Sequence, residues 1–215
     1  LGQKQLEDLP LDVEFKIPSL PIAKLSAVDY TFASIRGKMD ALIRLKGSLT
    51  APTITATAHV NDTLFANKKT GNLIIEASAS NDEVSALVDI QHGTTSVASI
   101  RAKAPVNLDV LQLIAGAEPR LPGKISGSIL ADGVDVAGLY PPRIFDNVID
   151  NVKGKLTSNL SVTGTWDSPQ LAGLIKIRDL NAFFPSIGRK IEEASLHIEA
   201  ADGGLNIVEF YAAEN

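Results

Sequence analysis

Three histidines and scattered carboxylates are the side chains of this 215-residue chain that could bind a metal or transfer protons. His59, His92 and His197 are far apart in the sequence, and no HExxH, EF-hand, P-loop, GxSxG or dinucleotide-binding motif occurs. Two of the histidines occupy polar positions of predicted strands, which is typical of solvated surface residues. There is no cysteine, which excludes thiol nucleophiles, disulfides and zinc-thiolate sites. We therefore expect no enzymatic activity, no cofactor and no bound metal.

The elements that would position such side chains are repeated. The passage GKMDALIRLKGSLTAPTITATAHVND from Gly37 recurs from Gly154 as GKLTSNLSVTGTWDSPQLAGLIKIRD, with a constant offset (154 − 37 = 117) and no gap. A repeat of this length indicates one supersecondary unit used twice, which favours an elongated architecture. The offset aligns Gly47, Pro52 and Asp62 with Gly164, Pro169 and Asp179.

Asp167, beside Ser168 and Pro169, lies in surroundings that resemble a catalytic site at first sight. The repeat argues against this role, because the first copy has Thr50 at the equivalent position of the same turn. An acid that is missing from the other copy is better explained as a turn former.

Apolar and polar residues alternate through most of the chain, which predicts antiparallel strands with one apolar and one polar face. The predicted turns lie at 47–52, 67–71, 80–83, 91–94 and 164–169. From Leu205 the alternation slips, which indicates a bulge or the end of a strand. The alternating residues predict strands near 11–17, 39–45, 54–60, 73–79, 84–90, 98–104, 125–131, 156–162, 171–177 and 195–200.

Two segments in the middle of the chain break this pattern. Residues 108–115 are apolar at nearly every position and precede Gly116, which predicts a short helix; a further buried strand is the alternative. A helix that is apolar all round cannot lie exposed, so we expect it in or over the apolar face of the sheet. Residues 141–152 predict a second helix after Pro141 and Pro142. The residues of the first segment proposed as a lid are Leu108, Leu111 and Ile114.

The composition restricts the partners. The net charge of −5 and the absence of a Lys/Arg cluster argue against nucleic-acid binding. No apolar run reaches the roughly 20 residues of a membrane span, and no signal peptide is recognisable. We expect the chain to be part of a longer protein, with any anchor in another segment.

The apolar face has two interpretations from the residues alone: the closed core of a β-sandwich, or an open groove. Small residues recur on it, among them Ala56, Ala77, Ala86, Ala102 and Gly173. They fill the space between two packed sheets poorly, because such sheets lie about 10 Å apart, but they leave room for a guest molecule.

Several passages resemble one protein family. VTGTWDSP, QLAGLIKIRDL and IGRKIEEASLHIEA follow a Gly-Lys start in the order found in the C-terminal region of the TamB family, within the AsmA-like bridge-like lipid-transfer proteins. APVNLDVLQLIAG resembles the segment that precedes this unit in the family. The resemblance covers about residues 37 to 215. Neither the inner-membrane anchor of the family nor the terminal segment for its outer-membrane partner is recognisable in residues 1–215, and we expect the anchor in a segment outside them.

The resemblance implies a fold, a location and an activity. The fold is all-β: an elongated, curved antiparallel sheet (a β-taco) with an apolar concave face and one or two short helices in the middle. The location is the periplasm, where such a protein bridges the inner and outer membranes and contacts an outer-membrane partner resembling TamA of the translocation and assembly module. The activity is passive conduction of phospholipid along the groove, for outer-membrane biogenesis.

On this interpretation residues 1–215 form one continuous sheet from a longer chain, with repeat units at 37–105 and 154–215 and an interrupting segment at 106–153. Two other functions remain open. One is a chaperone-like module whose sheet edge accepts a strand of an outer-membrane β-barrel protein; the other is a structural spacer with a dry core. The residues predicted to line the groove are Met39, Ile43, Leu45, Ile54, Val60, Leu73, Ile75, Val88, Ile90, Leu156, Leu160, Val162, Leu171, Ile175, Ile177, Leu196 and Ile198.

Overall fold

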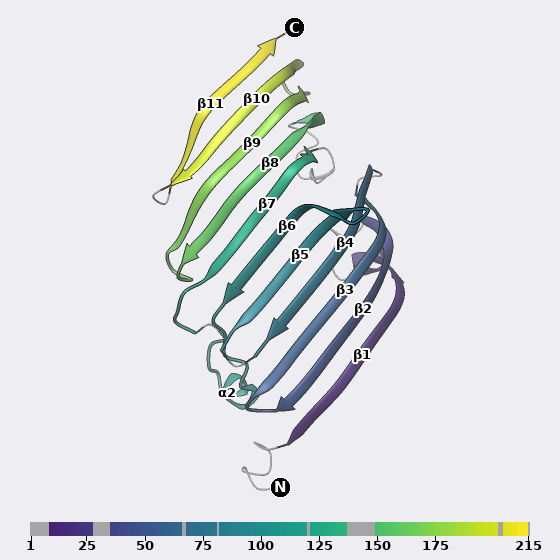
Figure 1. Cartoon of the computed structure of the whole chain (residues 1–215), viewed down its shortest axis with the longest axis vertical. Coiled ribbons are helices and arrows are strands. Elements are labelled where there is room, and N and C mark those ends of the chain that lie inside the picture. The colour runs from purple at the N-terminus through teal and green to yellow at the C-terminus, as the bar shows by residue number, and fades with distance from the viewer. Residues whose placement is uncertain are drawn as a thin grey trace.

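The chain forms one antiparallel sheet of eleven strands that follow one another across the sheet in chain order (Figure 1). The structure is a computed structural model and describes residues 9–27, 35–65, 68–80, 82–119, 121–136, 149–201 and 204–214. The all-β class, the antiparallel meander and the single curved sheet are confirmed. The strands are β1 (Pro10–Pro21), β2 (Ile35–Ser48), β3 (Pro52–Phe65), β4 (Lys68–Ala79), β5 (Val84–His92), β6 (Thr95–Ala104), β7 (Ser126–Asp135), β8 (Asp150–Gly164), β9 (Pro169–Phe184), β10 (Arg189–Ala201) and β11 (Gly204–Glu214).

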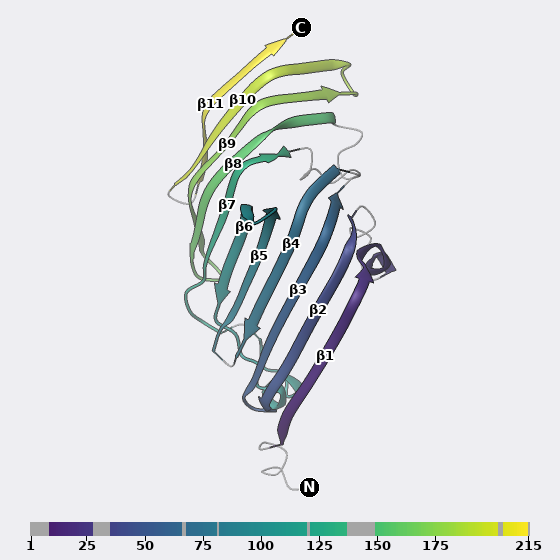
Figure 2. The same ribbon diagram turned by 45° about the vertical axis from the view of Figure 1, so that its right-hand side comes forward.

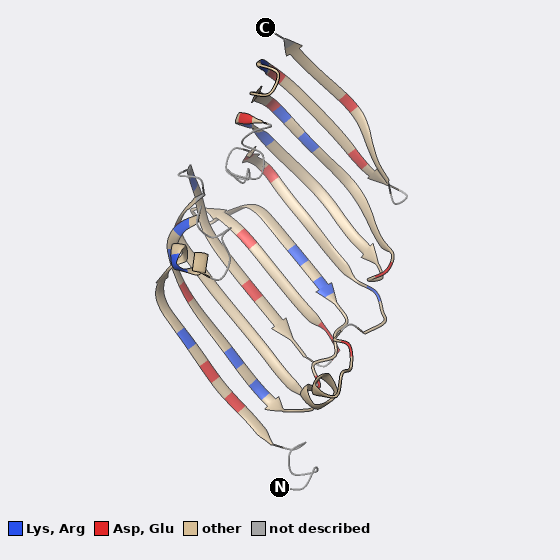
Figure 3. Cartoon of the chain, turned by 180° about the vertical axis from the view of Figure 1, so that it is seen from behind, with Lys and Arg blue, Asp and Glu red and all other residues tan. Residues whose placement is uncertain are grey.

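Two short helices accompany the sheet in the described residues. The 3-10 helix η1 (Ile22–Ala27) follows β1, and the α-helix α2 (Val110–Ile114) lies between β6 and β7. Figure 3 shows both in front of the sheet, at opposite ends of the strands. The second predicted helix falls mostly on residues 141–148, outside the described residues. Its last turn was wrong, because β8 already begins at Asp150 and includes Val152.

The sequence repeat is also a structural repeat. Gly47 pairs with Pro52 in β2 and β3, and Gly164 pairs with Pro169 in β8 and β9. Each turn is closed by the same main-chain hydrogen bond, Ser48 N to Ala51 O at 3.3 Å and Thr165 N to Ser168 O at 3.2 Å. The two copies therefore form the same hairpin with the same register.

Each hairpin contains the same irregularity. Four residues of β3, 61 to 64, lie opposite three residues of β2, 36 to 38. In the second copy, four residues of β9, 178 to 181, lie opposite three residues of β8, 153 to 155. The extra residue is Asp62 in one copy and Asp179 in the other, with φ of 53° and 52°. A left-handed extra residue of this kind is a β-bulge, which bends a strand and increases its twist.

Similar bulges recur in other strands, along an oblique line across the sheet that we call the crease. In β1 and β7 the extra residues are Ser19 and Gly133, with φ of 50° and 62°. In β10 the left-handed residue is Glu193, with φ of 55°. Figure 2 shows β8, β9 and β10 bending along their length. The aligned bulges explain why the sheet is curved.

The sheet does not close. Its two edges are β1 and β11, and no pairing joins them in the described strands. The accessible surface is 13673 Å², against about 9,600 Å² expected for a compact protein of this mass. The excess is what a curved single layer produces.

The β2–β3 and β8–β9 turns explain why glycine occupies equivalent positions in both copies. A Cβ atom at Gly47 would lie 2.3 Å from Ala51 O, and one at Gly164 would lie 2.3 Å from Ser168 O. Both glycines have positive φ, 105° and 98°. We predict that Gly47→Ala and Gly164→Ala each lower the free energy of unfolding by about 2–3 kcal/mol. Chemical denaturation measures this.

The matched control is Gly204→Ala, where the nearest atom to a new Cβ is Ala201 O at 3.7 Å and φ is not in the left-handed region. This change should cost less than about 0.5 kcal/mol. A loss at Gly47 much larger than at Gly164 would show that the two hairpins are not equivalent.

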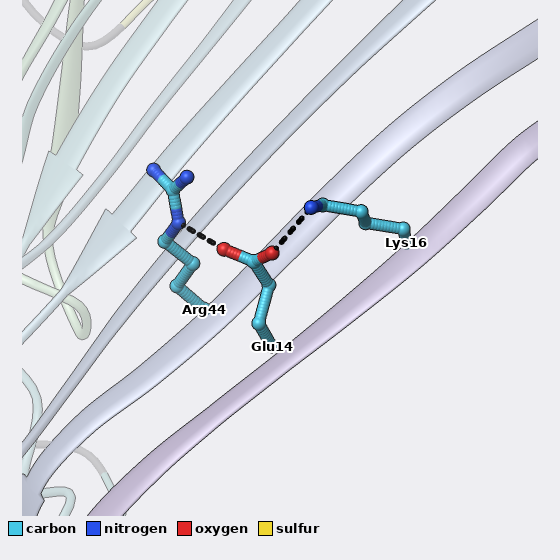
Figure 4. Close-up of polar contacts among 3 residues, drawn as sticks. All are labelled: Glu14, Lys16 and Arg44. Atoms are coloured by element: carbon cyan, nitrogen blue, oxygen red, sulfur yellow. Dashed lines mark hydrogen bonds and ion pairs between the residues drawn. The ribbon is translucent and has the colours of Figure 1, made fainter.

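An ion-pair cluster adds a side-chain link to the main-chain pairing of β1 with β2 (Figure 4). Glu14 Oε1 lies 2.8 Å from Lys16 Nζ, and Glu14 Oε2 accepts a hydrogen bond from Arg44 Nε at 2.7 Å. The hydrogen bonds from Lys16 and Arg44 lower the pKa of Glu14 from its ordinary 4.5 to about 2. The cluster is solvated, so salt screens it.

Because folding lowers this pKa, the ion pairs stabilise the attachment of β1 above pH 4.5, and the contribution is lost as the pH falls through about 2. We predict that a carbon-detected NMR titration of the Glu14 carboxyl has its midpoint near 2. The double change Lys16→Gln and Arg44→Gln should return the midpoint toward 4.5. A midpoint near 4.5 in the unaltered chain would show that the cluster does not form in solution.

Candidate functional site

The register places apolar residues of all eleven strands on one face of the sheet, because directly paired residues of antiparallel strands point to the same side. One row of paired residues crosses every strand: Ile17, Ala41, Ala58, Ile75, Val88, Ile100, Ile129, Leu160, Gly173, Ala200 and Leu205. A second does the same: Leu20, Met39, Val60, Leu73, Ile90, Ala98, Ala131, Ser158, Ile175, Ile198 and Ile207.

Three shorter rows complete what we call the apolar face. From β1 to β9 run Phe15, Ile43, Ala56, Ala77, Ala86, Ala102, Gly127, Val162 and Leu171. From β1 to β6 run Val13, Leu45, Ile54, Ala79, Val84 and Ala104. From β7 to β11 run Val134, Leu156, Ile177, Leu196 and Phe210.

The apolar face is uniform in its chemistry. Its five rows contain no Lys, Arg, Asp or Glu, and the hydroxyl of Ser158 is the sole polar side-chain group in them. That hydroxyl is buried and donates a hydrogen bond to Ile129 O at 3.4 Å. The face can therefore contact apolar matter but holds no group for acid–base or metal chemistry.

The apolar face is open over the described residues. Phe15, Ile100, Ile129 and Phe210 are exposed, and Ile43 retains 36% of its accessible surface. In the closed core of a sandwich these side chains would be buried by a second layer. Of the two interpretations of the apolar pattern, the structure agrees with the open one.

Buried residues occur in three of the five rows. Val60 is 1% exposed, and Ala131 and Ser158 of the same row are also buried. This row lies beside the bulges of β3 and β7. Leu160 and Ala200 in the first row, and Ala104 in one of the shorter rows, are buried as well.

The opposite face carries the charges and hydroxyls. Figure 3 shows Lys, Arg, Asp and Glu distributed along the strands without gathering into one patch. The histidines are not brought together, since they lie on β3, β5 and β10. His92 Nε2 is 2.9 Å from Thr70 O, and His197 Nε2 is 3.7 Å from Glu199 Oε1. No group of three metal-binding side chains occurs in the part of the chain that the structure describes.

All seventeen predicted groove residues lie in the five rows. The predicted set omitted other members of the same face, such as Phe15, Ile17 and Ile129, although the period of two already marked these positions. Val134 and Phe210 were harder to assign, because the bulges beside them change the phase of the alternation. The bulge expected near Leu205 is present, with Val208 unpaired between Ile207 and Glu209.

The segment predicted as a lid lies at the ends of the strands. It forms the predicted helix, α2, with Asp109 as N-cap accepting from Leu111 N and Gln112 N at 3.0 Å each. Val110 N donates to Leu49 O at 2.9 Å, which places the helix beside the β2–β3 turn. The expectation that this helix cannot be exposed was wrong, because Ile114 is 79% exposed and none of its residues is buried. A helix of five residues is too short for all of its apolar side chains to be buried. The prediction that Leu108 and Leu111 gate the groove remains a prediction.

Comparison of the chain with family models, with curated proteins and with solved structures finds no match. Among the described helices none is both long and apolar enough to cross a membrane. The functional argument therefore depends on the geometry of the apolar face.

Openness of the face can be tested by introducing a charge. Ile43→Arg should lower the free energy of unfolding by only about 1 kcal/mol, because the guanidinium reaches water along the open face. Val60→Arg should cost about 4 kcal/mol or more, because it buries an unpaired charge at the crease. Thermal melting followed by circular dichroism measures both, and a collapse with Ile43→Arg as severe as with Val60→Arg would show that the face is covered in solution.

Proposed function

We propose that this chain is part of a periplasmic bridge that conducts phospholipid between the inner and outer membranes, with the acyl chains lying on the apolar face. The observation that carries the proposal is the register, which keeps charged residues out of five rows, two of which cross all eleven strands. The resemblance to the TamB family points the same way. The outer-membrane partner resembling TamA would be reached through regions beyond residues 1–215.

The dimensions suit acyl chains. The two rows that cross all eleven strands are about 48 Å long, because neighbouring strands lie about 4.8 Å apart. The hydrocarbon core of a bilayer is about 30 Å thick, so one leaflet's acyl layer is about 15 Å deep. The rows exceed this length about threefold, so a lipid has to move along the face and is not held in a single pocket.

The energetics favour movement over tight binding. Moving about 30 methylenes from water into a hydrocarbon environment releases roughly 25 kcal/mol. A bilayer offers the same gain, so the transfer from membrane to protein is close to neutral. The polar headgroup remains in solvent, since the rows offer it no charged or hydrogen-bonding partner apart from Ser158.

The proposal predicts that phospholipid co-purifies with the chain and that a charge in the rows stops its transfer. Native mass spectrometry should detect bound phospholipid. In a vesicle assay with fluorescent phospholipid, Ile43→Arg should slow transfer at least about tenfold, because desolvating a guanidinium beside alkyl chains costs well over 1.4 kcal/mol.

Leu42→Arg is the matched control. Leu42 is the neighbour of Ile43 in β2 and pairs with Thr57 on the polar face, so the same charge there should leave transfer unchanged. Equal transfer by the two variants, or a chain that never carries phospholipid, would overturn the proposal.

A further inference from the structure

The boundary between β6 and β7, which we call the seam, has the shortest ladder in the described sheet. Pairing runs from Ala98 to Lys103 in β6 and from Ser126 to Ala131 in β7, which is six residue pairs. The β2–β3 and β8–β9 ladders have twelve pairs each. Beyond Ala131, β7 remains paired with β8 at Val134 but is no longer paired with β6. The seam is therefore held over only part of the length of its strands.

The side chains that meet across the seam on the apolar face are mostly small. Three pairs cross it there: Ala98 with Ala131, Ala102 with Gly127, and Ile100 with Ile129. The last is the sole pair of two large apolar residues, and both of them are exposed. Between β8 and β9 the same face has two such pairs, Leu156 with Ile177 and Val162 with Leu171. Because cross-strand side-chain pairs stabilise a sheet beyond its main-chain hydrogen bonds, the seam gains less from them than the β8–β9 ladder does.

The seam also contains a glycine that has no room for a side chain. Gly127 lies so close to β6 that a Cβ atom there would be 2.8 Å from Arg101 O. Its φ is not in the left-handed region, so the close approach of the two strands is what requires glycine. A larger residue at this position would push β6 and β7 apart.

One end of the seam is tied, and the other is not. Pro105, the first residue after β6, accepts hydrogen bonds at its carbonyl from Trp166 Nε1 at 3.4 Å and from Leu121 N at 3.5 Å. Trp166 belongs to the β8–β9 turn, so this contact joins strands on the two sides of the seam. Figures 1 and 2 show β6 and β7 diverging toward their opposite ends. The seam thus has a fixed point at Pro105.

We propose that the seam is a hinge, at which strands β1–β6 and strands β7–β11 move as two bodies about Pro105. The short ladder and its small side chains make local opening easier here than in the β2–β3 and β8–β9 ladders. The six pairs of the seam yield, while the register inside each body is kept. The motion changes the curvature of the apolar face. The hinge goes beyond the lipid conduction proposed above and does not depend on it.

Spin labels measure the motion, because the chain has no cysteine and labels attach only where cysteines are introduced. Glu76→Cys and Ser161→Cys lie in one row of the polar face, four strands apart and on either side of the seam. The matched control, Leu42→Cys with Arg101→Cys, uses the same row and the same number of strands within β1–β6. Double electron–electron resonance should give a distance distribution at least about twice as wide for the first pair. Equal widths would overturn the proposal.

Hydrogen exchange followed by NMR locates the hinge. Successive amides of β6 point alternately to β5 and to β7, so the strand contains its own control. Amides bonded to β7 should exchange at least about tenfold faster than those bonded to β5. Gly127→Ala should widen this difference, whereas Gly204→Ala, where the nearest atom to the new Cβ is 3.7 Å away, should not. If both sets of β6 amides exchange at the same rate, or if Gly127→Ala accelerates exchange equally in every strand, the sheet opens as one body and the hinge does not exist.

Discussion

The architecture of this sheet depends on its register. Several strands contain extra residues, and the apolar side chains nevertheless stay on one face of the sheet. Side chains alternate with a period of two, so an uncompensated one-residue slip would turn a strand's apolar side outward. Extra residues nevertheless occur in β1, β3, β7 and β9, at Ser19, Asp62, Gly133 and Asp179. They lie along one line, the crease. On the side of the crease where the strands are longer, the pairing therefore remains in phase across all eleven strands.

The same bulges convert a flat surface into a curved one. Each left-handed residue bends its strand, and the succession of bulges from strand to strand adds the bends along one oblique line. Opposite the bulges in β3 and β9 stand Gly37 and Gly154, where a Cβ would lie 2.9 Å from Val60 Cγ1 and 3.1 Å from Arg178 O. The glycine that begins each repeat thus permits the close approach of strands at the crease, which buries Val60 and leaves the outer rows open.

An open apolar face is unfavourable in water, and this cost argues for an occupant. At about 25 cal/mol per Å², exposed alkyl surface across five rows would favour association with any apolar partner. In a β-sandwich, a second sheet packs on the apolar face and removes its alkyl surface from water. Here the described residues provide only η1 and α2, both at the strand ends. Acyl chains, the occupant proposed above, would cover the face without a fixed binding geometry, because alkyl contacts are non-directional.

Much of this architecture is predictable from local sequence patterns. The period of two identified the strands, and the offset of 117 identified the equivalent hairpins, because both depend on neighbouring residues. The openness of the face was not decidable from the same patterns, since Ile43 would be apolar in a closed core as well. The position of α2 was also out of reach, because it depends on long-range hydrogen bonds such as that from Val110 N to Leu49 O. Nor could the pattern show that β1 and β11 are the edges, because edge status belongs to the assembled sheet.

The apolar rows continue to the edge strand β11 in the described residues. Leu205, Ile207 and Phe210 end three of the five rows there. At the other edge, Pro10, Pro18 and Pro21 of β1 lack an N–H, and the Glu14 cluster adds charge, both of which disfavour a further strand. Each strand adds one residue, or about 4.8 Å, to a row. The length of the apolar face therefore depends on how many strands pair side by side.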